Sequence, residues 1–245
     1  MMGMLTLSTL VLAAPLVVID PGHGGTEHGA QGRCGVLEKD VVLGISKELS
    51  AVLEESGTAK TLLTREGDAT VALEERAELA NLHDAALFVS IHANASPNPK
   101  NAGVETFFLS MDRVDPRHRA LVRRENEGRS VSAPAHADPL QSMLHRLALD
   151  ASHHESQRLA IRLHDELARS TPYRARGVMQ APFVVLKGAK MAAALVEVGF
   201  LTHPTQCRKL KTQAHQRTIA TQIAGGIIAH LRATDLKRSR AALTR

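Results

Sequence analysis

The chain has 245 residues, of which 44% are hydrophobic and 22% charged, so it is long enough for one sizeable α/β domain and too short for two. Its net charge of +5 suits an acidic partner, but a nucleic-acid binder would also need aromatic side chains for stacking. The sequence has no Trp, one Tyr and five Phe, so we expect no nucleic-acid partner.

The first residues, 4–14, are apolar, rich in small residues and uncharged. They resemble the apolar part of a secretory signal but lack the basic segment that normally precedes it. We interpret residues 1–15 as the remnant of a signal peptide, or as one with a misassigned start. The segment is too short to cross a bilayer, so we expect no stable membrane span.

A buried parallel strand is predicted at residues 16–19, because the run is apolar without alternation and stops at Asp20-Pro21. A loop with six glycines follows and carries His23, and Glu38 stands at its far end. In open α/β sheets, ligands bind at the carboxyl ends of the strands. The first hypothesis is that His23 and Glu38 are two ligands of a catalytic metal.

The rest of the chain alternates between strand and helix patterns. The expected strands are 16–19, 61–65, 86–91, 103–109 and 191–200, and the expected helices are 39–56, 72–83, 117–127, 139–151, 155–170 and 211–231. This alternation predicts an α/β fold with a mostly parallel twisted sheet and helices on both faces. The tail after residue 231 is polar, and we expect it to be loose.

His92 follows the strand at 86–91 directly, as His23 follows the first strand. Two histidines and Glu38 from neighbouring strand ends can therefore meet at one point. Three protein ligands with an open fourth position are typical of a catalytic zinc. The sequence contains no compact ligand motif, so this prediction depends on topology.

Glu197 is the one carboxylate in the apolar strand at 191–200. An acid in such a place is unfavourable unless it has a partner or a task. Beside a metal-bound water it would act as the general acid and base, and we predict this role. The alternative is a structural salt bridge with Arg65 or a nearby lysine.

Five segments in this order resemble the zinc-dependent N-acetylmuramoyl-L-alanine amidases of the amidase-3 type. They are VVIDPGHGG, LEKD, FVSIHANAS, GVETFFL and ALVEVGFLTHP. The resemblance implies one zinc held by His23, Glu38 and His92, with Glu197 as the catalytic residue. It implies cleavage of the amide between N-acetylmuramic acid and L-alanine of peptidoglycan, in wall remodelling or daughter-cell separation. It also implies a periplasmic or extracellular location in a bacterial cell envelope.

Three further features are weighed separately. Glu27-His28 replaces the Asp-Pro that is common in the family, and His28 is either a loop residue or an alternative metal contact. Glu105 matches the family pattern, and we expect it in the wall of the site, with a role in orienting His92 or substrate as the alternative. Cys34 and Cys207 either form one bridge or stay free.

Residues 111–171 form a long charged segment with helical patterns, inserted between two strands of the sheet. In cell-division amidases an insert at this place resembles a helix that covers the zinc until a protein activator removes it. Glu125 stands where such a helix supplies a resting zinc ligand. The alternative is a solvated amphipathic cover. We expect one catalytic domain at 16–233 that includes this insert, and a basic tail at 234–245.

Two other functions stay open. A wall-binding or regulatory relative would keep the fold without turnover, but all four of His23, Glu38, His92 and Glu197 are present, which favours catalysis. A zinc carboxypeptidase is the second alternative, because similar zinc sites on α/β sheets also serve that chemistry.

Overall fold

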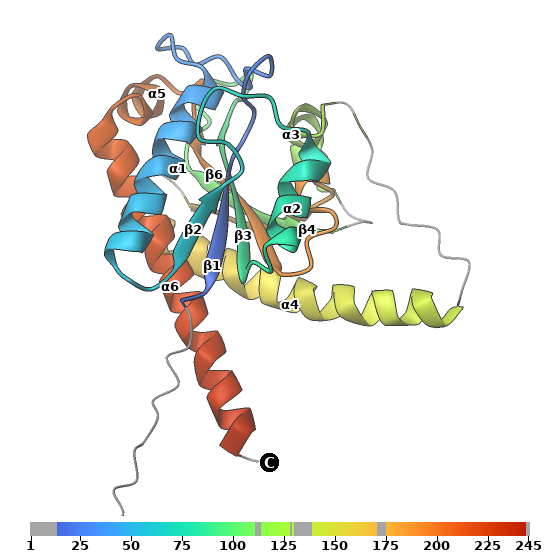
Figure 1. Ribbon diagram of the computed structural model, residues 1–245. Coiled ribbons are helices and arrows are strands. Elements are labelled where there is room, and N and C mark those ends of the chain that lie inside the picture. Colours follow the sequence, from blue (N-terminus) through green and yellow to red (C-terminus); the bar gives the residue numbers. More distant parts are fainter. Residues whose placement is uncertain (1–13, 111–113, 128, 130–138, 171–174, 244–245) are drawn as a thin grey trace, which may run out of the picture.

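The computed structural model describes residues 14–110, 114–127, 129, 139–170 and 175–243, so most of the expected leader lies outside the described residues. One six-stranded sheet organises the molecule, in the strand order β2-β1-β3-β6-β4-β5 (Figure 1). Its strands are β1 (Leu16–Pro21), β2 (Lys60–Leu63), β3 (Leu87–Asn94), β4 (Val104–Leu109), β5 (Ala175–Ala181) and β6 (Ala192–Phe200). The predicted α/β fold is confirmed.

The pairing of the strands is parallel except at one place. β1 pairs in parallel with β2 and β3, β3 with β6, and β4 with β5, whereas β4 runs antiparallel to β6. Because β1, β3 and β6 are parallel, their carboxyl ends share one edge of the sheet. The register places His92 opposite Glu197 and Glu105 on the other side of Glu197.

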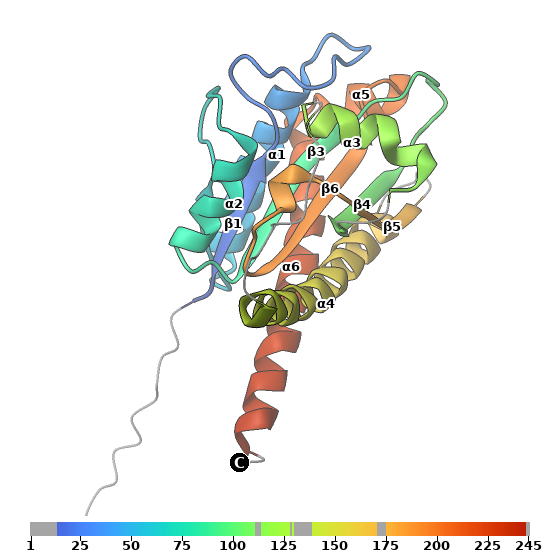
Figure 2. The same ribbon diagram turned by 90° about the vertical axis from the view of Figure 1, so that its right-hand side faces the viewer.

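Helices cover both faces of the sheet (Figures 1 and 2). The α-helices are α1 (Glu38–Glu55), α2 (Leu73–Leu82), α3 (Arg119–Glu125), α4 (Pro139–Ser170), α5 (Pro204–Leu210) and α6 (Gln213–Leu243). Two short 3₁₀ helices, η1 (Pro116–His118) and η2 (Val184–Leu186), complete the set. One core packs α1, α4 and α6 against the sheet, and a second packs α2, α3 and η2 against the other face.

Two expectations about secondary structure are wrong, and one strand was not expected. α4 is one helix, although two were expected at 139–151 and 155–170. α6 continues to Leu243, so the loose tail after residue 231 is replaced by a helix that projects beyond the sheet (Figure 1). β5 was not expected, because an edge strand is half-exposed and lacks a continuous apolar run.

Cys34 and Cys207 form a disulfide, with their Cα atoms 5.8 Å apart. The bridge ties the glycine-rich loop to α5, far away in sequence. Of the two alternatives left open by the sequence, the structure takes the bonded one.

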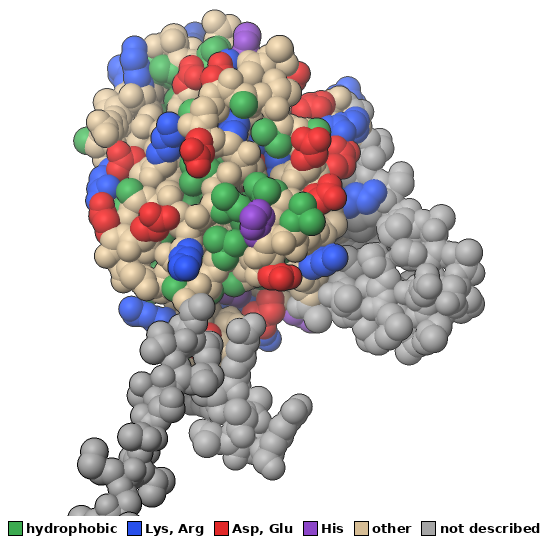
Figure 3. Space-filling view, in the orientation of Figure 1, with side chains coloured by type: hydrophobic (Ala, Val, Ile, Leu, Met, Phe, Trp, Pro, Cys, Tyr) green, Lys and Arg blue, Asp and Glu red, His purple; other side chains and the backbone are tan. Residues whose placement is uncertain are grey.

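The surface carries both signs of charge. On the face drawn in Figure 3, acidic and basic side chains are interspersed, so the net charge of +5 is not gathered there into one basic region. None of the described helices combines the length and apolarity needed to cross a membrane.

Candidate metal centre

Four side chains meet at the shared carboxyl edge of β1, β3 and β6. His23 Nε2, Glu38 Oε1, His92 Nδ1 and Glu125 Oε2 all lie within 4.8 Å of one another. Glu125 Oε2 is 3.1 Å from His23 Nε2 and 2.8 Å from His92 Nδ1. Glu38 Oε1 is 3.3 Å from His23 Nε2 and 3.2 Å from His92 Nδ1. The structure thus brings together every residue that the sequence analysis named as a metal ligand.

Glycines allow the loop to wrap this closely around the centre. A Cβ atom at Gly22 would lie 2.4 Å from the His92 ring. Gly29 has a φ of +66°, and a Cβ there would lie 2.6 Å from His23 and 2.7 Å from Glu38 Oε2. Only a residue without a side chain fits at either position. Backbone amides of Ala30 and Ala93 donate to the two oxygens of Glu38 and fix its orientation.

Two buried arginines hold the backbone that carries His23. Arg76 donates to the carbonyls of Pro21 and His23, and Arg65 donates to those of Pro21 and Gly22. No sequence pattern predicts this frame, and the one signal for it is Arg65 at the end of an apolar strand. Since Arg65 points to these carbonyls, the alternative of a salt bridge between Arg65 and Glu197 is wrong.

Asp20 neutralises Arg76 at the base of the frame. Its carboxylate is fully buried and accepts hydrogen bonds from Arg76, Ser90 and Thr64. Burial raises the pKa of Asp20, but the Arg76 charge and the three donors together outweigh burial and lower it. The carboxylate is therefore charged in the folded protein and supports both the strand and the loop after it.

Asp20→Asn is expected to lower the free energy of unfolding at pH 7 by about 3–5 kcal/mol, because it leaves the buried Arg76 charge without a partner. The folded pKa lies below the unfolded value, so this stabilisation is present above about pH 4 and is lost as the pH falls through the folded pKa. Urea unfolding at pH 7 and pH 3 measures it. The exposed control Asp235→Asn should stay within about 0.5 kcal/mol. Equal stability of Asp20→Asn and wild type at pH 7 would refute the prediction.

The charges of the centre suit a divalent cation. Burial lowers the pKa of His23, but Glu38 and Glu125 outweigh it and raise the pKa to about 9. Burial raises the pKa of Glu38, but His23 outweighs it and lowers the pKa to about 2. His23 Nε2 and Glu125 Oε2 are buried and face each other at 3.1 Å, and neither atom makes a well-aligned hydrogen bond. Two imidazoles and two carboxylates in this arrangement form a donor set that fits zinc.

Glu197 lies beside this centre but outside the group of four. Both of its oxygens are buried, and neither has a hydrogen-bond partner. Burial, and after it the charge of Glu125, raises the pKa of Glu197 well above its ordinary value. An acid with a raised pKa and no structural partner is suited to accept and return a proton near neutral pH.

The side chain of Glu105 contacts residues other than His92, which was considered as its partner from the sequence. Its oxygens accept hydrogen bonds from Asn94 Nδ2 at 2.8 Å and Arg176 Nε at 2.5 Å, and lie 3.4 Å from His118 Nε2. These contacts do not include His92, so they give no support to the alternative that Glu105 orients His92. His28 is exposed and stands outside the group of four, so it is a loop residue.

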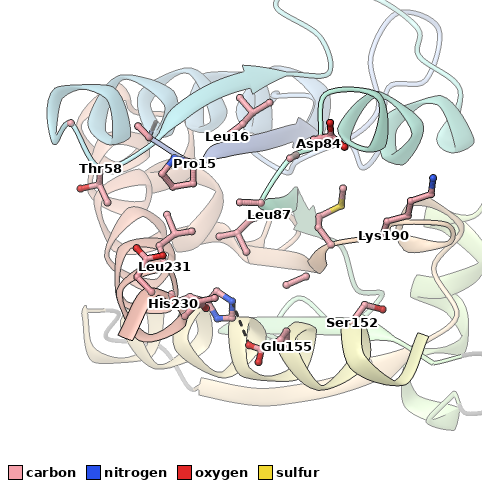
Figure 4. A pocket seen from close by; sticks show the side chains of 18 residues that line it. Pro15, Leu16, Thr58, Asp84, Leu87, Ser152, Glu155, Lys190, His230 and Leu231 are labelled. Atoms are coloured by element: carbon pink, nitrogen blue, oxygen red, sulfur yellow. Dashed lines mark hydrogen bonds and ion pairs between the residues drawn. The ribbon is translucent and has the colours of Figure 1, made fainter. Parts of the chain in front are cut away.

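A separate pocket of about 800 Å³ lies at the opposite ends of the strands, where β1 and β3 begin (Figure 4). It is lined by Leu16 and Leu87, which begin β1 and β3, and by His230, whose Nε2 lies 3.9 Å from Glu155 Oε2. Leu87 is five residues from His92, or roughly 16 Å along the strand. This pocket is therefore distinct from the metal centre.

A sheet that gathers two histidines and two glutamates at one edge, beside an unpartnered buried acid, is typical of metal-dependent hydrolases. The comparison with known families is specific. The chain belongs to the enzyme family of N-acetylmuramoyl-L-alanine amidases described as Amidase_3, whose model matches residues 17–229.

Curated and solved relatives agree with this family. The chain is 38% identical to N-acetylmuramoyl-L-alanine amidase AmiA of Salmonella typhimurium over 228 residues, which covers 91% of this chain and 78% of the relative. It is similar to the amidase AmiC2 of Nostoc punctiforme, with a TM-score of 0.67, 31% identity, and coverage of 89% and 97% of the two chains. It is also similar to the CwlD amidase from Clostridioides difficile, solved in complex with the GerS lipoprotein, with a TM-score of 0.69, 25% identity, and coverage of 89% and 99%.

Proposed function

We propose that this protein is a zinc-dependent hydrolase that cleaves the amide between N-acetylmuramic acid and L-alanine in peptidoglycan. One observation carries the proposal: His23, Glu38 and His92 converge, and the unpartnered Glu197 lies in register with His92. The donor set fits zinc, and Glu197 has no structural partner that would explain its burial. Membership of the amidase family names the bond.

The residues around the centre divide the work of hydrolysis. Zinc, when bound by His23, Glu38 and His92, supplies a Lewis acid that polarises the scissile carbonyl and makes a nearby water more acidic. The Glu197 carboxylate takes a proton from the attacking water, so that hydroxide adds to the carbonyl carbon. Glu197 then gives this proton to the leaving nitrogen of L-alanine as the C–N bond breaks. Water is consumed, and one carboxylic acid and one amine are formed.

Product analysis tests this function. Zinc-loaded protein is incubated with purified peptidoglycan, and the soluble products are identified by mass spectrometry. We expect free lactyl carboxyl groups on the glycan and intact stem peptides that begin with L-alanine. Release of terminal amino acids would establish the carboxypeptidase alternative. If folded, zinc-loaded protein forms no products, that result would favour the non-catalytic alternative.

We infer that the protein acts outside the cytoplasmic membrane. The substrate lies there, and the Cys34–Cys207 bridge suits an oxidising compartment. The solved complex of the CwlD amidase with a lipoprotein supports regulation by a protein partner. We therefore propose periplasmic or extracellular action in wall remodelling or cell separation, under the control of an activator.

The activator would act on α3, which brings Glu125 into the centre (Figure 2). We propose that Glu125 occupies the fourth zinc position in a resting form, in place of water. Arg124 Nε donates to Glu125 Oε1 at 2.7 Å and holds its carboxylate. Asn126 donates to Pro182 O and accepts from Val184 N, and so anchors the end of α3 to the body. Activation would shift this equilibrium towards an open form.

Glu125→Ala is expected to raise partner-free amidase activity by about 5- to 150-fold, the range of typical coupling free energies. The reason is that the variant frees the fourth zinc position for water. The rate on purified peptidoglycan measures it. The exposed neighbour Glu127, changed to Ala, is the matched control and should leave the rate unchanged. If Glu125→Ala is no more active than wild type, the resting-ligand proposal is wrong.

A further inference from the structure

Arg176 at the start of β5 presents a guanidinium that is held on two sides. Its Nε donates to Glu105 Oε1 at 2.5 Å, and its Cζ lies 5.3 Å from the centre of the Phe200 ring. About 30% of the side chain is exposed. Within the described part of the chain, no residue accepts from its two terminal nitrogens. The guanidinium is therefore held in place by its Nε contact, while its two terminal nitrogens stay available to bind a ligand.

Glu105, the ion-pair partner of Arg176, already uses both of its carboxylate oxygens to accept hydrogen bonds within the protein. Glu105 is 1% exposed, and its other oxygen accepts from Asn94 Nδ2. Burial raises the pKa of Glu105, but His118 and Arg176 outweigh it and lower the pKa, so the group is a charged anchor. Glu105 binds the Nε side of the guanidinium, while about 30% of the Arg176 side chain stays exposed. Two outward N–H groups of this kind match the geometry of a carboxylate.

The strand order places Arg176 on a line with the reaction centre. The metal-binding histidines belong to β3 and to the loop after β1, and the next strand, β6, carries Glu197. Glu105 on β4 faces Glu197, and Arg176 lies on β5, next to the register pair of Val104 and Ala175. Arg176 is thus two strand spacings, or about 10 Å, from Glu197 along the sheet.

The direction of this line matches the direction of the substrate, and this step depends on the proposed function. The scissile carbonyl belongs at the metal, and the leaving nitrogen belongs at Glu197, which protonates it. The peptide beyond that nitrogen therefore extends across β4 towards β5. Two extended residues span about 7 Å, which brings the second residue of the peptide within reach of a long arginine side chain.

We propose that Arg176 is a specificity-determining residue that binds a free carboxylate on the second residue of the stem peptide. A glutamate joined to L-alanine and linked onward through its side-chain carboxyl keeps its α-carboxylate free. The outward donors of Arg176 pair with this carboxylate in a two-pronged contact. An α-carboxamide at the same place is neutral, and in a two-pronged contact its NH2 group would face an N–H donor of the guanidinium, so it binds less well.

A pair of substrates isolates this contact. The probes are a muramoyl-L-Ala-D-Glu compound whose side-chain carboxyl is blocked as an amide, and the same compound with the α-carboxyl also converted to carboxamide. kcat/KM is measured for zinc-loaded wild type, Arg176→Gln and Arg176→Lys, and again with Glu125→Ala added. Wild type is expected to prefer the carboxylate substrate by at least about tenfold. Arg176→Gln is expected to bring the ratio near one, and Arg176→Lys is expected to restore part of it.

The ratio within one enzyme distinguishes recognition from a structural role. If Arg176 only neutralised Glu105, its loss would change both substrates equally and leave the ratio intact, and that result would overturn the proposal. The control Arg217→Gln, on α6 in an exposed pair with Glu48, should keep the wild-type ratio. If neither substrate is cleaved, the proposed function fails on its own. Calorimetric binding of L-Ala-γ-D-Glu then decides the role of Arg176: weaker binding to Arg176→Gln supports it, and equal binding refutes it.

Discussion

Glu197→Gln is expected to lower kcat by about 10²–10⁴-fold while zinc content stays at about one per chain. The side chain is outside the group of four ligand atoms, so its loss removes no metal ligand. Glutamine has nearly the same shape but takes up no proton from water and returns none to the leaving nitrogen. The experiment therefore separates proton transfer from metal binding.

The fold of the Glu197→Gln variant should survive. The wild-type carboxyl is fully buried with no hydrogen-bond partner, so the neutral amide breaks no polar contact. Turnover of a muramoyl peptide and metal analysis of the purified protein are measured together. Glu48→Gln, on the surface of α1, is the control and should match wild type in both. Near-normal turnover would remove Glu197 from the mechanism, and loss of zinc would make it a ligand.

His92→Ala is expected to lose both zinc and turnover. His92 Nδ1 lies 2.8 Å from Glu125 Oε2 and 3.2 Å from Glu38 Oε1, at the middle of the cluster. Without the imidazole, the three ligands of the active form become two, and the resting set with Glu125 falls from four to three, so zinc content should fall clearly below one per chain. Turnover follows zinc, because the carbonyl is no longer polarised.

Metal analysis by mass spectrometry and urea unfolding of the metal-free proteins measure this second prediction. The unfolding data show whether the variant is folded and merely metal-free. His83→Ala, at the exposed end of α2, is the control and should retain zinc. Stoichiometric zinc in folded His92→Ala would contradict the proposed ligand set.

The carboxyl ends of strands were the most informative feature of the sequence. His23 follows β1, and His92 stands near the end of β3, two positions that are far apart in the chain. Parallel strands align their carboxyl ends, so apolar runs that end in polar residues indicate a shared edge before any coordinates exist. The structure adds that these residues are close enough to share one ion.

The hydrogen bonds that hold the backbone and side chains around these residues could not be predicted from where the strands end. Arg76 lies in α2, yet it donates to the carbonyl of His23, 53 residues earlier. No local period or spacing encodes such a contact. The same holds for the contact of Glu105 with Arg176, 71 residues apart. Hydrogen bonds between distant segments depend on how the sheet brings them together, and hydrophobic periodicity records only which face is buried.

Thus the sequence by itself determined the α/β layering, the edge where the polar residues gather and the family to which the chain belongs. The layering and the edge follow from apolar periodicity and from glycine positions, which act over a few residues, whereas the family follows from the resemblance of five motifs. Only the tertiary structure decided that α4 is one helix, that β5 forms the sheet edge, that Cys34 joins Cys207, and that Glu197 has no partner. Each of these outcomes depends on burial and pairing between segments distant along the chain, whose free energy no local window contains.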